Sequence, residues 1–415
     1  MSVLTQAEIV RIRVQIPRVF TPGSPIDHKD FLAGRLKERD QAIAAVSRVG
    51  QHAAIYGERG VGKTSLAGLV HQFWLEVSKD HSLIAVRINC DPLDDYPTIW
   101  ANVAEEIRER LPYIEGEEEE SGAEPRQEFF RLREQLESVI AGQATPNIIR
   151  RMFQQATDYT FIVVVDEFDR LNSQEAIGLM ADTIKTLSDH QVNATLIIVG
   201  VADRVDDLMH EHGSIDRALI QVLVPRMTTE ELDQIVSNGL HRIGMEIEAQ
   251  ALSFTSRIAQ GLPYYAHLLG LTSSLRAITD NRIRITLEDV IDGLRDAVNN
   301  AQESVQSAYY RATVSPRKES LYRQVLLACT LAQVDELGYF YPAAVREPLT
   351  RIMGRPYDIP SYLSHLNALS SSERGGVLQK TGEQRRRRYR FADPLLRPYV
   401  ILRGLSEGLI KPQDA

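Results

Sequence analysis

The sequence predicts an α/β fold in which a parallel sheet covered by helices is followed by a helical region and a smaller C-terminal unit. From about residue 31 to 225, apolar runs of strand length alternate with stretches of helical spacing, which is typical of strand–helix–strand units. From 226 to 312 the pattern is helical throughout, and residues 316–405 follow as a last unit. Residues 1–30 contain IPRVFTPGSPID and are predicted to be an extended arm, because proline disfavours long regular structure.

The individual elements are read from apolar runs and cap signals. Thr228 and Glu231 have the spacing of a capping box at the start of the helical region. The stretch TVSPRKES is predicted to link this region to the last unit. The strand candidates of the first region are HAAIYG, LIAVRINC, FIVVVDEF and ATLIIVGVA.

Length and composition limit the class of protein. A chain of 415 residues with 43% hydrophobic content is expected to form two or three globular units. Cys90 and Cys329 are the only cysteines; without metal-ligand spacing they indicate two small core residues rather than a disulfide framework or a zinc site. The longest apolar runs fall short of the roughly 18 residues of a membrane helix, and the N-terminus lacks the apolar centre of a secretory signal. A cytoplasmic protein without a membrane partner is therefore expected.

Charge is distributed unevenly along the chain. The net charge is −9, yet residues 316–411 contain 16 Lys and Arg against 9 Asp and Glu, a balance of +7. The acidic run EGEEEESGAEP at residues 115–125 is predicted to be a solvated surface insertion.

The stretch GERGVGKT, residues 57 to 64, fits the P-loop pattern G-x-x-x-x-G-K-[ST] between a predicted strand and a predicted helix. Its glycines allow a tight turn whose N–H groups converge on a phosphate, and the following helix presents its positive end there. Lys63 is expected to reach the terminal phosphates and Thr64 to ligate Mg²⁺. The predicted phosphate-binding residues are Gly57, Glu58, Arg59, Gly60, Val61, Gly62, Lys63, Thr64 and Ser65.

A pair of acids supports the same chemistry. Asp166 and Glu167 follow a strongly apolar strand candidate, and open α/β sheets bind ligands at the carboxyl edge of their strands. Asp166 would hold Mg²⁺, and Glu167 would orient and polarise the attacking water. The sequence therefore predicts an ATPase that uses ATP and Mg²⁺.

Together these motifs resemble the AAA+ ATPases, most closely the clade of origin-recognition and helicase-loader proteins and related bacterial ATPases. The resemblance rests on AGRLKERDQAI, the P-loop, VRINC, DEFDRL and the helical region after residue 226. It implies a P-loop sheet, an α-helical lid and ATP sites completed by a neighbouring subunit. The family's G-R-x-x-E element near the adenine maps onto Gly34, Arg35 and Glu38.

The resemblance also implies three polar residues around the phosphates. Asp203 takes the place of the polar sensor, with a helix cap as the alternative, and Asn89 matches a residue that restrains the catalytic Glu, with a strand-end turn as the alternative. Arg217 in GSIDRALIQVLVPRM matches the arginine finger offered to a neighbour, whereas the alternative is an exposed helix charge. Arg226 is the fallback candidate for the finger.

The lid departs from the initiator pattern. Initiator-like members carry an arginine in a motif close to G-D-x-R, whereas this chain reads QGLPYYAHLLG, with Tyr264 in that place. The spacing of Gly261 and Pro263 is instead similar to the lid motif of STAND signalling ATPases, in which the proline packs near the adenine. Without this cationic contact to the phosphates, slow hydrolysis is expected.

The order of three helical stretches and a hairpin in residues 316–405 looks like a winged helix. Its basic tip is predicted to contact the phosphate backbone of double-stranded DNA. The alternatives are that these cations bind the chain's own acidic insertion or an acidic face of a partner protein. The tip contains Lys380, Arg385, Arg386, Arg387, Arg388 and Arg390.

Three function classes follow. The first is an ATP-gated homo-oligomeric switch that binds DNA. The second is a STAND-like signalling or antiviral-defence ATPase whose oligomer recruits a protein effector. The third, a processive motor, lacks any further supporting motif. The basic hairpin favours the first class, and the G-x-P lid favours the second.

Overall fold

A computed structural model describes residues 5–78, 82–120, 127–209, 215, 217–299, 303–315, 320–383, 386–393 and 396–411. Within these residues the chain divides into two compact units. One unit, here called the base, comprises residues 25–58 and 62–224, and the other, here called the helical unit, comprises residues 1–24, 59–61 and 225–415.

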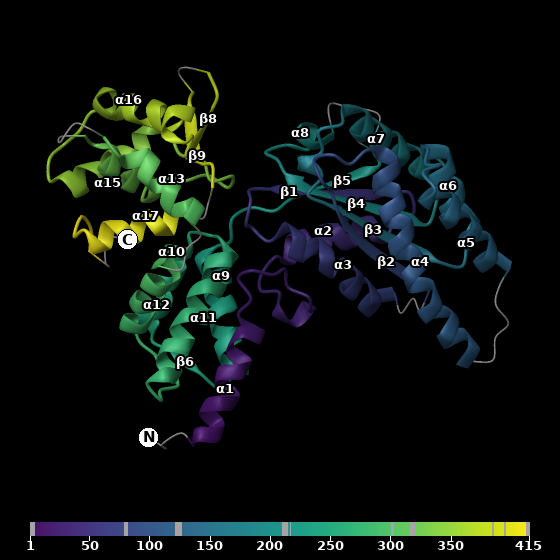
Figure 1. The fold of residues 1–415 in the computed structure, drawn as a ribbon, viewed down its shortest axis with the longest axis horizontal. Coiled ribbons are helices and arrows are strands. Elements are labelled where there is room, and N and C mark those ends of the chain that lie inside the picture. The colour runs from purple at the N-terminus through teal and green to yellow at the C-terminus, as the bar shows by residue number, and fades with distance from the viewer. Residues whose placement is uncertain are drawn as a thin grey trace. The chain divides into compact units, whose positions relative to one another are not determined.

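The base contains a five-stranded parallel sheet in the order β2-β3-β4-β1-β5 (Figure 1). All four predicted strands form, and the fifth, β5, adds to the edge beside β1. Parallel pairing makes every strand end at the same edge, so the polar residues that follow β1, β3 and β4 share that edge. The strands are β1 (His52–Gly57), β2 (Leu83–Asn89), β3 (Thr160–Asp166), β4 (Ala194–Val201) and β5 (Leu219–Leu223).

Helices cover both faces of the sheet, as a parallel sheet requires. On one face α4, α6 and α7 share a core with alternate residues of β2 and β3, such as Val86 and Val163. On the other face α2 packs on β5 and β1, and α3 packs on β1, β3 and β4. The helices of the base are α2 (Leu36–Val46), α3 (Lys63–Ser78), α4 (Tyr96–Glu120), α5 (Gln127–Ile140), α6 (Pro146–Gln155), α7 (Gln174–Asp189) and α8 (Val205–Met209), with the 3-10 turns η1 (Lys29–Phe31) and η2 (Phe168–Arg170).

The acidic run at residues 115–125 is not a separate loop in its first part. Residues 115–120 continue α4 as a helix, and residues 121–125 lie outside the described residues. Cys90 and Cys329 are both buried and reduced, as expected for core residues. None of the described helices combines the length and the apolarity needed to cross a membrane.

The predicted lid forms four helices in the helical unit. Thr228 and Glu231 form the expected capping box at the start of α9. The short strands β6 (Glu246–Ile247) and β7 (Arg284–Ile285) pair in parallel between these helices. The helices are α9 (Thr229–Arg242), α10 (Ala249–Ala259), α11 (Pro263–Thr279) and α12 (Leu287–Asn299).

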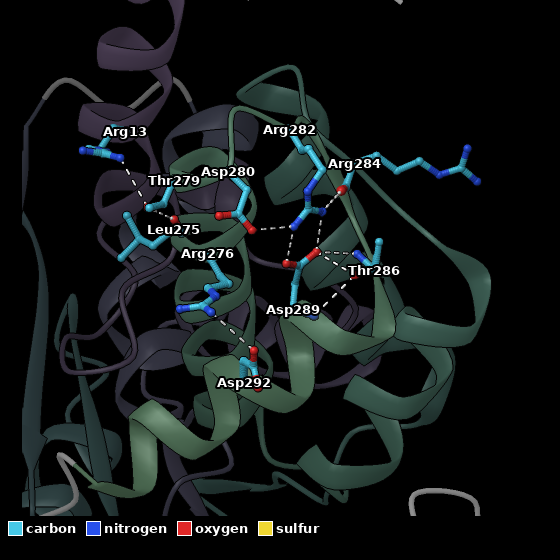
Figure 2. Close-up of polar contacts among 10 residues, drawn as sticks. All are labelled: Arg13, Leu275, Arg276, Thr279, Asp280, Arg282, Arg284, Thr286, Asp289 and Asp292. Carbon is cyan, nitrogen blue, oxygen red and sulfur yellow. Dashed lines mark hydrogen bonds and ion pairs between the residues drawn. The ribbon is translucent and has the colours of Figure 1, made fainter.

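An ion-pair network fixes the end of α11 to the start of α12 (Figure 2). The Arg282 guanidinium donates two hydrogen bonds to the nearly buried carboxylate of Asp289, at 2.7 and 2.8 Å. Thr286 donates to the same carboxylate through its N–H and its hydroxyl. Although burial raises the pKa of Asp289, these hydrogen bonds outweigh it and hold the pKa below its usual value.

The prediction of an extended arm over residues 1–30 is wrong for its first part. Residues Gln6–Val19 form helix α1, capped by a reciprocal box between Thr5 and Glu8. Its isoleucines at positions 9, 12 and 16 are buried, and α1 packs on α11. Pro17 lies in the last turn of α1, where its missing N–H leaves the carbonyl of Arg13 without a helical hydrogen bond, and the helix ends two residues later.

Phe20 anchors this N-terminal helix in the helical unit. Its side chain is 1% exposed and lies against two glycines, since a Cβ at Gly239 or Gly270 would come within 2.7 or 2.5 Å of the ring. The ring also meets His267 edge-on, and the N–H of Thr21 donates to Nδ1 of His267 at 3.3 Å. The glycines thus form a socket that only a flat side chain fills.

The C-terminal part of the helical unit has the predicted order of helices and hairpin. Strands β8 (Leu378–Thr381) and β9 (Arg388–Phe391) pair antiparallel, and Phe340 forms an isolated bridge to Tyr389. The assignment as a winged helix stays a prediction. The predicted linker TVSPRKES begins at Thr313, which still belongs to α13, and its residues 316–319 lie outside the described residues. The helices are α13 (Glu303–Thr313), α14 (Tyr322–Thr330), α15 (Pro342–Met353), α16 (Ile359–Leu369) and α17 (Leu396–Ser406), with the 3-10 turn η3 (Ser372–Arg374).

Candidate nucleotide site

The predicted P-loop connects β1 to α3 at the carboxyl edge of the sheet. Gly57, Gly60 and Gly62 have φ values of 146°, 84° and 99°, a region that favours glycine. At Gly57 a Cβ would lie 2.4 Å from the backbone oxygen of Val224, at the end of β5. The turn therefore depends on glycine for both conformation and space.

Lys63 begins α3 with its side chain turned back over the loop. The side chain is buried, with only 7% of the residue exposed, and its ammonium donates to the backbone oxygen of Glu58 at 2.9 Å. Burial of a cation beside the first turn of a helix creates a positive site, because the helix start adds its own partial positive charge. An anion with several charges, such as a triphosphate, fits this arrangement.

Asp166 and Thr64 meet across the sheet edge. Asp166 ends β3 and is 3% exposed. Burial raises the pKa of its carboxyl, whereas hydrogen bonds from the Glu167 N–H and the Thr64 hydroxyl, together with the charge of Arg87, lower it in part. A buried carboxylate beside a hydroxyl is an oxygen donor set that suits Mg²⁺, so these residues fit the predicted metal ion.

Glu167 has a left-handed backbone conformation, with φ 55°, which is uncommon for a residue other than glycine. Its carboxylate is about half exposed and forms an ion pair with Arg170, whose guanidinium also reaches Asp91 at 3.4 Å. Sequence reasoning missed this contact, although Arg170 stands in the quoted DEFDRL motif, three residues after Glu167.

Two further predicted residues stand near this edge by topology. Asn89 ends β2 directly beside Asp166 in the strand register and is exposed. Asp203 follows the end of β4, the strand between β3 and β1. The roles of Asn89 and Asp203 stay predictions.

The element predicted near the adenine has an unusual backbone. Gly34 and Arg35 are both left-handed, with φ 63° and 60°, and Arg35 is buried immediately before α2. Glu38 lies in the first turn of that helix. Strained backbone conformations gather at functional sites, which fits the predicted role, but contact with adenine stays a prediction.

Ser65, predicted at the phosphates, has a structural contact. Its hydroxyl accepts a hydrogen bond from the N–H of Ile26 at 3.1 Å. Ser65 thus ties the segment before α2 to the first turn of α3.

Arg217 lies at the opposite edge of the base. It is exposed in a turn two residues before β5, and its backbone oxygen accepts a hydrogen bond from Gln51, which precedes β1. Of the predicted alternative, an exposed helix charge, the exposure is confirmed but the helix is wrong, because residue 217 is in a turn. The role of Arg217 stays a prediction. Strand β1 has six residues, so this edge is roughly 20 Å from the P-loop at about 3.3 Å per residue.

The remaining predicted residues belong to the helical unit. Pro263 is the first residue of α11, and Gly261 before it has φ 82°. The guanidinium of Arg226 donates to the backbone oxygen of Gln260 at 3.0 Å. Both residues therefore stand at the start of the lid helix α11, and their roles toward nucleotide stay predictions.

The basic hairpin is only partly free. Arg388 forms an ion pair with Asp335 at 2.9 Å and lies over the Tyr339 ring, and Arg390 lies over the same ring. Arg387 reaches Asn367 on α16. Lys380 and Arg386 are exposed, while Arg385 lies outside the described residues.

Comparison with known proteins gives one family. The model of the family Novel STAND NTPase 1 matches residues 25–349. No curated protein matches the sequence.

The chain is also similar to solved structures. A Walker-type ATPase of Pyrococcus abyssi is similar over 92% of this chain and 99% of its own, with 16% identity and a TM-score of 0.53. The ORC2 protein of Aeropyrum pernix, in ADPNP–ADP complexes, is similar over 94% of this chain and 98% of its own, with 14% identity and a TM-score of 0.49. The ORC1 protein of the same organism, in complex with DNA, is 13% identical over 94% of this chain and 97% of its own, with a TM-score of 0.49.

Proposed function

The chain belongs to the Novel STAND NTPase 1 family, and we propose that it is an ATP-dependent switch whose nucleotide state controls the assembly of its copies. The observation that carries this proposal is the meeting of three groups at one sheet edge. They are the buried ammonium of Lys63, the hydroxyl of Thr64 and the buried carboxylate of Asp166. This set has the charge and the donors that a magnesium nucleotide requires.

Each residue has a role that follows from its chemistry. Lys63 would exchange its bond to the Glu58 carbonyl for the terminal phosphates, and the loop N–H groups would bind the phosphates between them. Thr64 and Asp166 would hold Mg²⁺, which neutralises phosphate charge when bound. Glu167 would orient the attacking water and accept its proton.

Two features support slow hydrolysis. Glu167 is paired with Arg170, so its carboxylate must release the guanidinium before it can orient a water molecule and accept its proton. In addition, the lid carries Tyr264 where initiator-like ATPases have an arginine. The slow hydrolysis of bound nucleotide would therefore set how long the ATP-bound state lasts, rather than drive rapid turnover.

The proposal that a neighbour completes the site is supported by Arg217. At roughly 20 Å from the P-loop of its own chain, an exposed arginine cannot reach its own nucleotide. The same side chain is available to a second copy, where a guanidinium would neutralise charge on the γ-phosphate. Arg226 is the fallback, although it is engaged with Gln260.

The output of the switch has two candidates. Exposed Lys380 and Arg386, with the positive balance of residues 316–411, support contact with double-stranded DNA. Two observations favour a protein effector instead. Arg388 and Arg390 pack against Tyr339, and α16, the third helix of the winged-helix interpretation, contains no Lys or Arg in IPSYLSHLNAL. We therefore favour the STAND-like reading, with an effector as partner.

Nucleotide-site variants test the core of the proposal. Lys63→Ala is expected to abolish ATP binding in equilibrium titrations, and Glu167→Gln to retain ATP while losing hydrolysis. Lys185→Ala and Glu175→Gln, which change exposed residues of α7, are the matched controls. Wild-type hydrolysis in both site variants would refute the assignment.

Particle mass tests the assembly and its output. We expect mass photometry to find larger particles with ATP than with ADP, whether or not duplex DNA is present. Growth only with DNA would support the DNA-binding switch, and a constant monomer would refute assembly. Mixing Arg217→Ala with Lys63→Ala protein should restore part of the ATPase rate, because one chain supplies the arginine and the other the intact P-loop.

A further inference from the structure

A hollow on the base lies away from the P-loop. It has a volume of about 300 Å³ and is bounded by the segment Pro25–Asp27, the first half of α3, strands β2 and β3, and Arg110 of α4. This volume is at the lower end of the range for small-molecule sites. Within the described residues, no side chain of the helical unit lines it.

The floor of the hollow is apolar. Ala67 of α3, Ala85 of β2, and Ile162 and Val164 of β3 form it. Parallel sheets are normally covered on both faces, and β2 is covered on its other face, where Ile84, Val86 and Ile88 are buried. On the hollow side Ala85 is only partly buried, so apolar surface beside the edge strand remains open to a ligand.

The rim of the hollow carries positive charge. Arg87 is exposed and forms no hydrogen bond or ion pair with any described residue, and Arg110 pairs only with Glu106 of its own helix. His71 has a pKa lowered by burial and by the charge of Arg110, so it is neutral at pH 7. Asp27 is the one carboxylate among the described lining residues. Two arginines and one aspartate therefore border an apolar floor.

We propose that this hollow is a binding site for a small organic anion with an apolar body. The anionic group would lie at Arg87 and Arg110, and the apolar body would cover Ala85, Ile162 and Val164. A planar aromatic acid meets both requirements, since guanidinium groups bind carboxylate, sulfonate or phosphate oxygens in pairs.

A ligand in the hollow would affect α3, the helix that follows the P-loop. The wall residue Ile26 donates its N–H to Ser65, next to Thr64, and Gln72 of α3 donates to the backbone oxygen of Asp27. A ligand that moves this wall acts on the first turn of α3. The lining of the hollow includes none of the P-loop residues, so the site can exist whether or not the chain hydrolyses ATP.

The test uses 8-anilinonaphthalene-1-sulfonate, an aromatic anion that fluoresces when it leaves water. The full-length chain is titrated in saturating Mg²⁺ and ADP, so that the nucleotide site is not available to the probe. We expect saturable binding to one site. Arg87→Gln, which removes one cation, and Gly68→Leu, which fills the hollow from α3, should each raise the dissociation constant at least about tenfold.

The controls distinguish binding at this site from nonspecific binding of the probe. Gly178→Leu, at a helix position with open space around it, and Arg133→Gln, an exposed arginine of α5, should bind the probe like the wild type. The neutral analogue N-phenyl-1-naphthylamine should bind more weakly and without dependence on Arg87. Equal binding by Arg87→Gln and wild type, or by the neutral analogue and the anion, would overturn the proposal. If circular dichroism shows that Gly68→Leu does not fold, the result for Arg87→Gln alone decides whether the proposal holds.

Discussion

Removal of the Phe20 ring is expected to destabilise the helical unit without affecting the base. A buried phenylalanine removes about 200 Å² from water, worth about 5 kcal/mol at about 25 cal/mol per Å². Because alanine keeps part of that area and the denatured chain is already partly compact, we expect Phe20→Ala to cost about 3–4 kcal/mol. In the Phe20→Ala variant a cavity would remain between Gly239 and Gly270, because neither glycine has a side chain that could fill it.

The tryptophans allow the two units to be followed separately. Trp74 on α3 and Trp100 on α4 are the only two in the chain, and both belong to the base. In a urea titration, tryptophan fluorescence therefore reports the base, whereas far-ultraviolet circular dichroism reports both units. Phe20→Ala should move the part of the dichroism transition that belongs to the helical unit to lower urea and leave the fluorescence midpoint unchanged.

Val14→Ala is the matched control, because Val14 is on the same helix but is 52% exposed. It should change stability by less than about 0.5 kcal/mol. A loss below about 1 kcal/mol for Phe20→Ala, or an equal shift of the fluorescence midpoint, would refute the view that Phe20 is the anchor of α1 in its own unit.

Three further predictions concern the base and the hairpin. Burial lowers the pKa of His52 to about 4. The free energy of unfolding of the base is therefore expected to be greatest above about pH 6.5 and to fall by about 3 kcal/mol as the pH decreases to 4. His52→Asn should flatten this pH profile in unfolding followed by fluorescence. Gly57→Ala, whose Cβ would meet the Val224 oxygen at 2.4 Å, is expected to weaken ATP binding at least about a hundredfold in titration calorimetry, and wild-type affinity would contradict the geometry of the turn. Arg388→Ala, which removes the pair with Asp335 and the contact with Tyr339, should cost about 1–2 kcal/mol, whereas Arg386→Ala should leave thermal stability unchanged, as differential scanning fluorimetry can check.

Periodicity and capping rules predicted most of the base and the lid. All four apolar strand candidates formed, because runs such as FIVVVDEF are buried on both faces of a parallel sheet. Strand β5 was missed since LIQVL is short and its middle residue, Gln221, is exposed. The Thr228–Glu231 cap formed as its spacing required.

The N-terminal helix and the pairing of charges lay beyond sequence reasoning. The isoleucines of α1 are buried where this helix packs on α11, more than 240 residues later in the chain. The prolines nearby therefore indicated an extended arm, because a contact so distant in the chain cannot be predicted from local sequence. In the same way, the six cations of the hairpin indicated a basic tip that is free to bind a partner. Folding places Asp335 and Tyr339 against two of these cations, Arg388 and Arg390, and the local sequence does not predict these contacts. Local rules identify which groups are charged, and tertiary packing decides which remain available.

The position of Arg217 has a consequence for how activity depends on abundance. An arginine at the far end of β1 from the phosphate-binding turn is too distant to reach the nucleotide of its own chain. Under the proposed finger role, an isolated copy would therefore turn over at its basal rate however much ATP surrounds it. Activity per molecule would then rise with the amount of protein present, and simple dilution would silence it. A cell that carries such a chain would set its threshold by expression level.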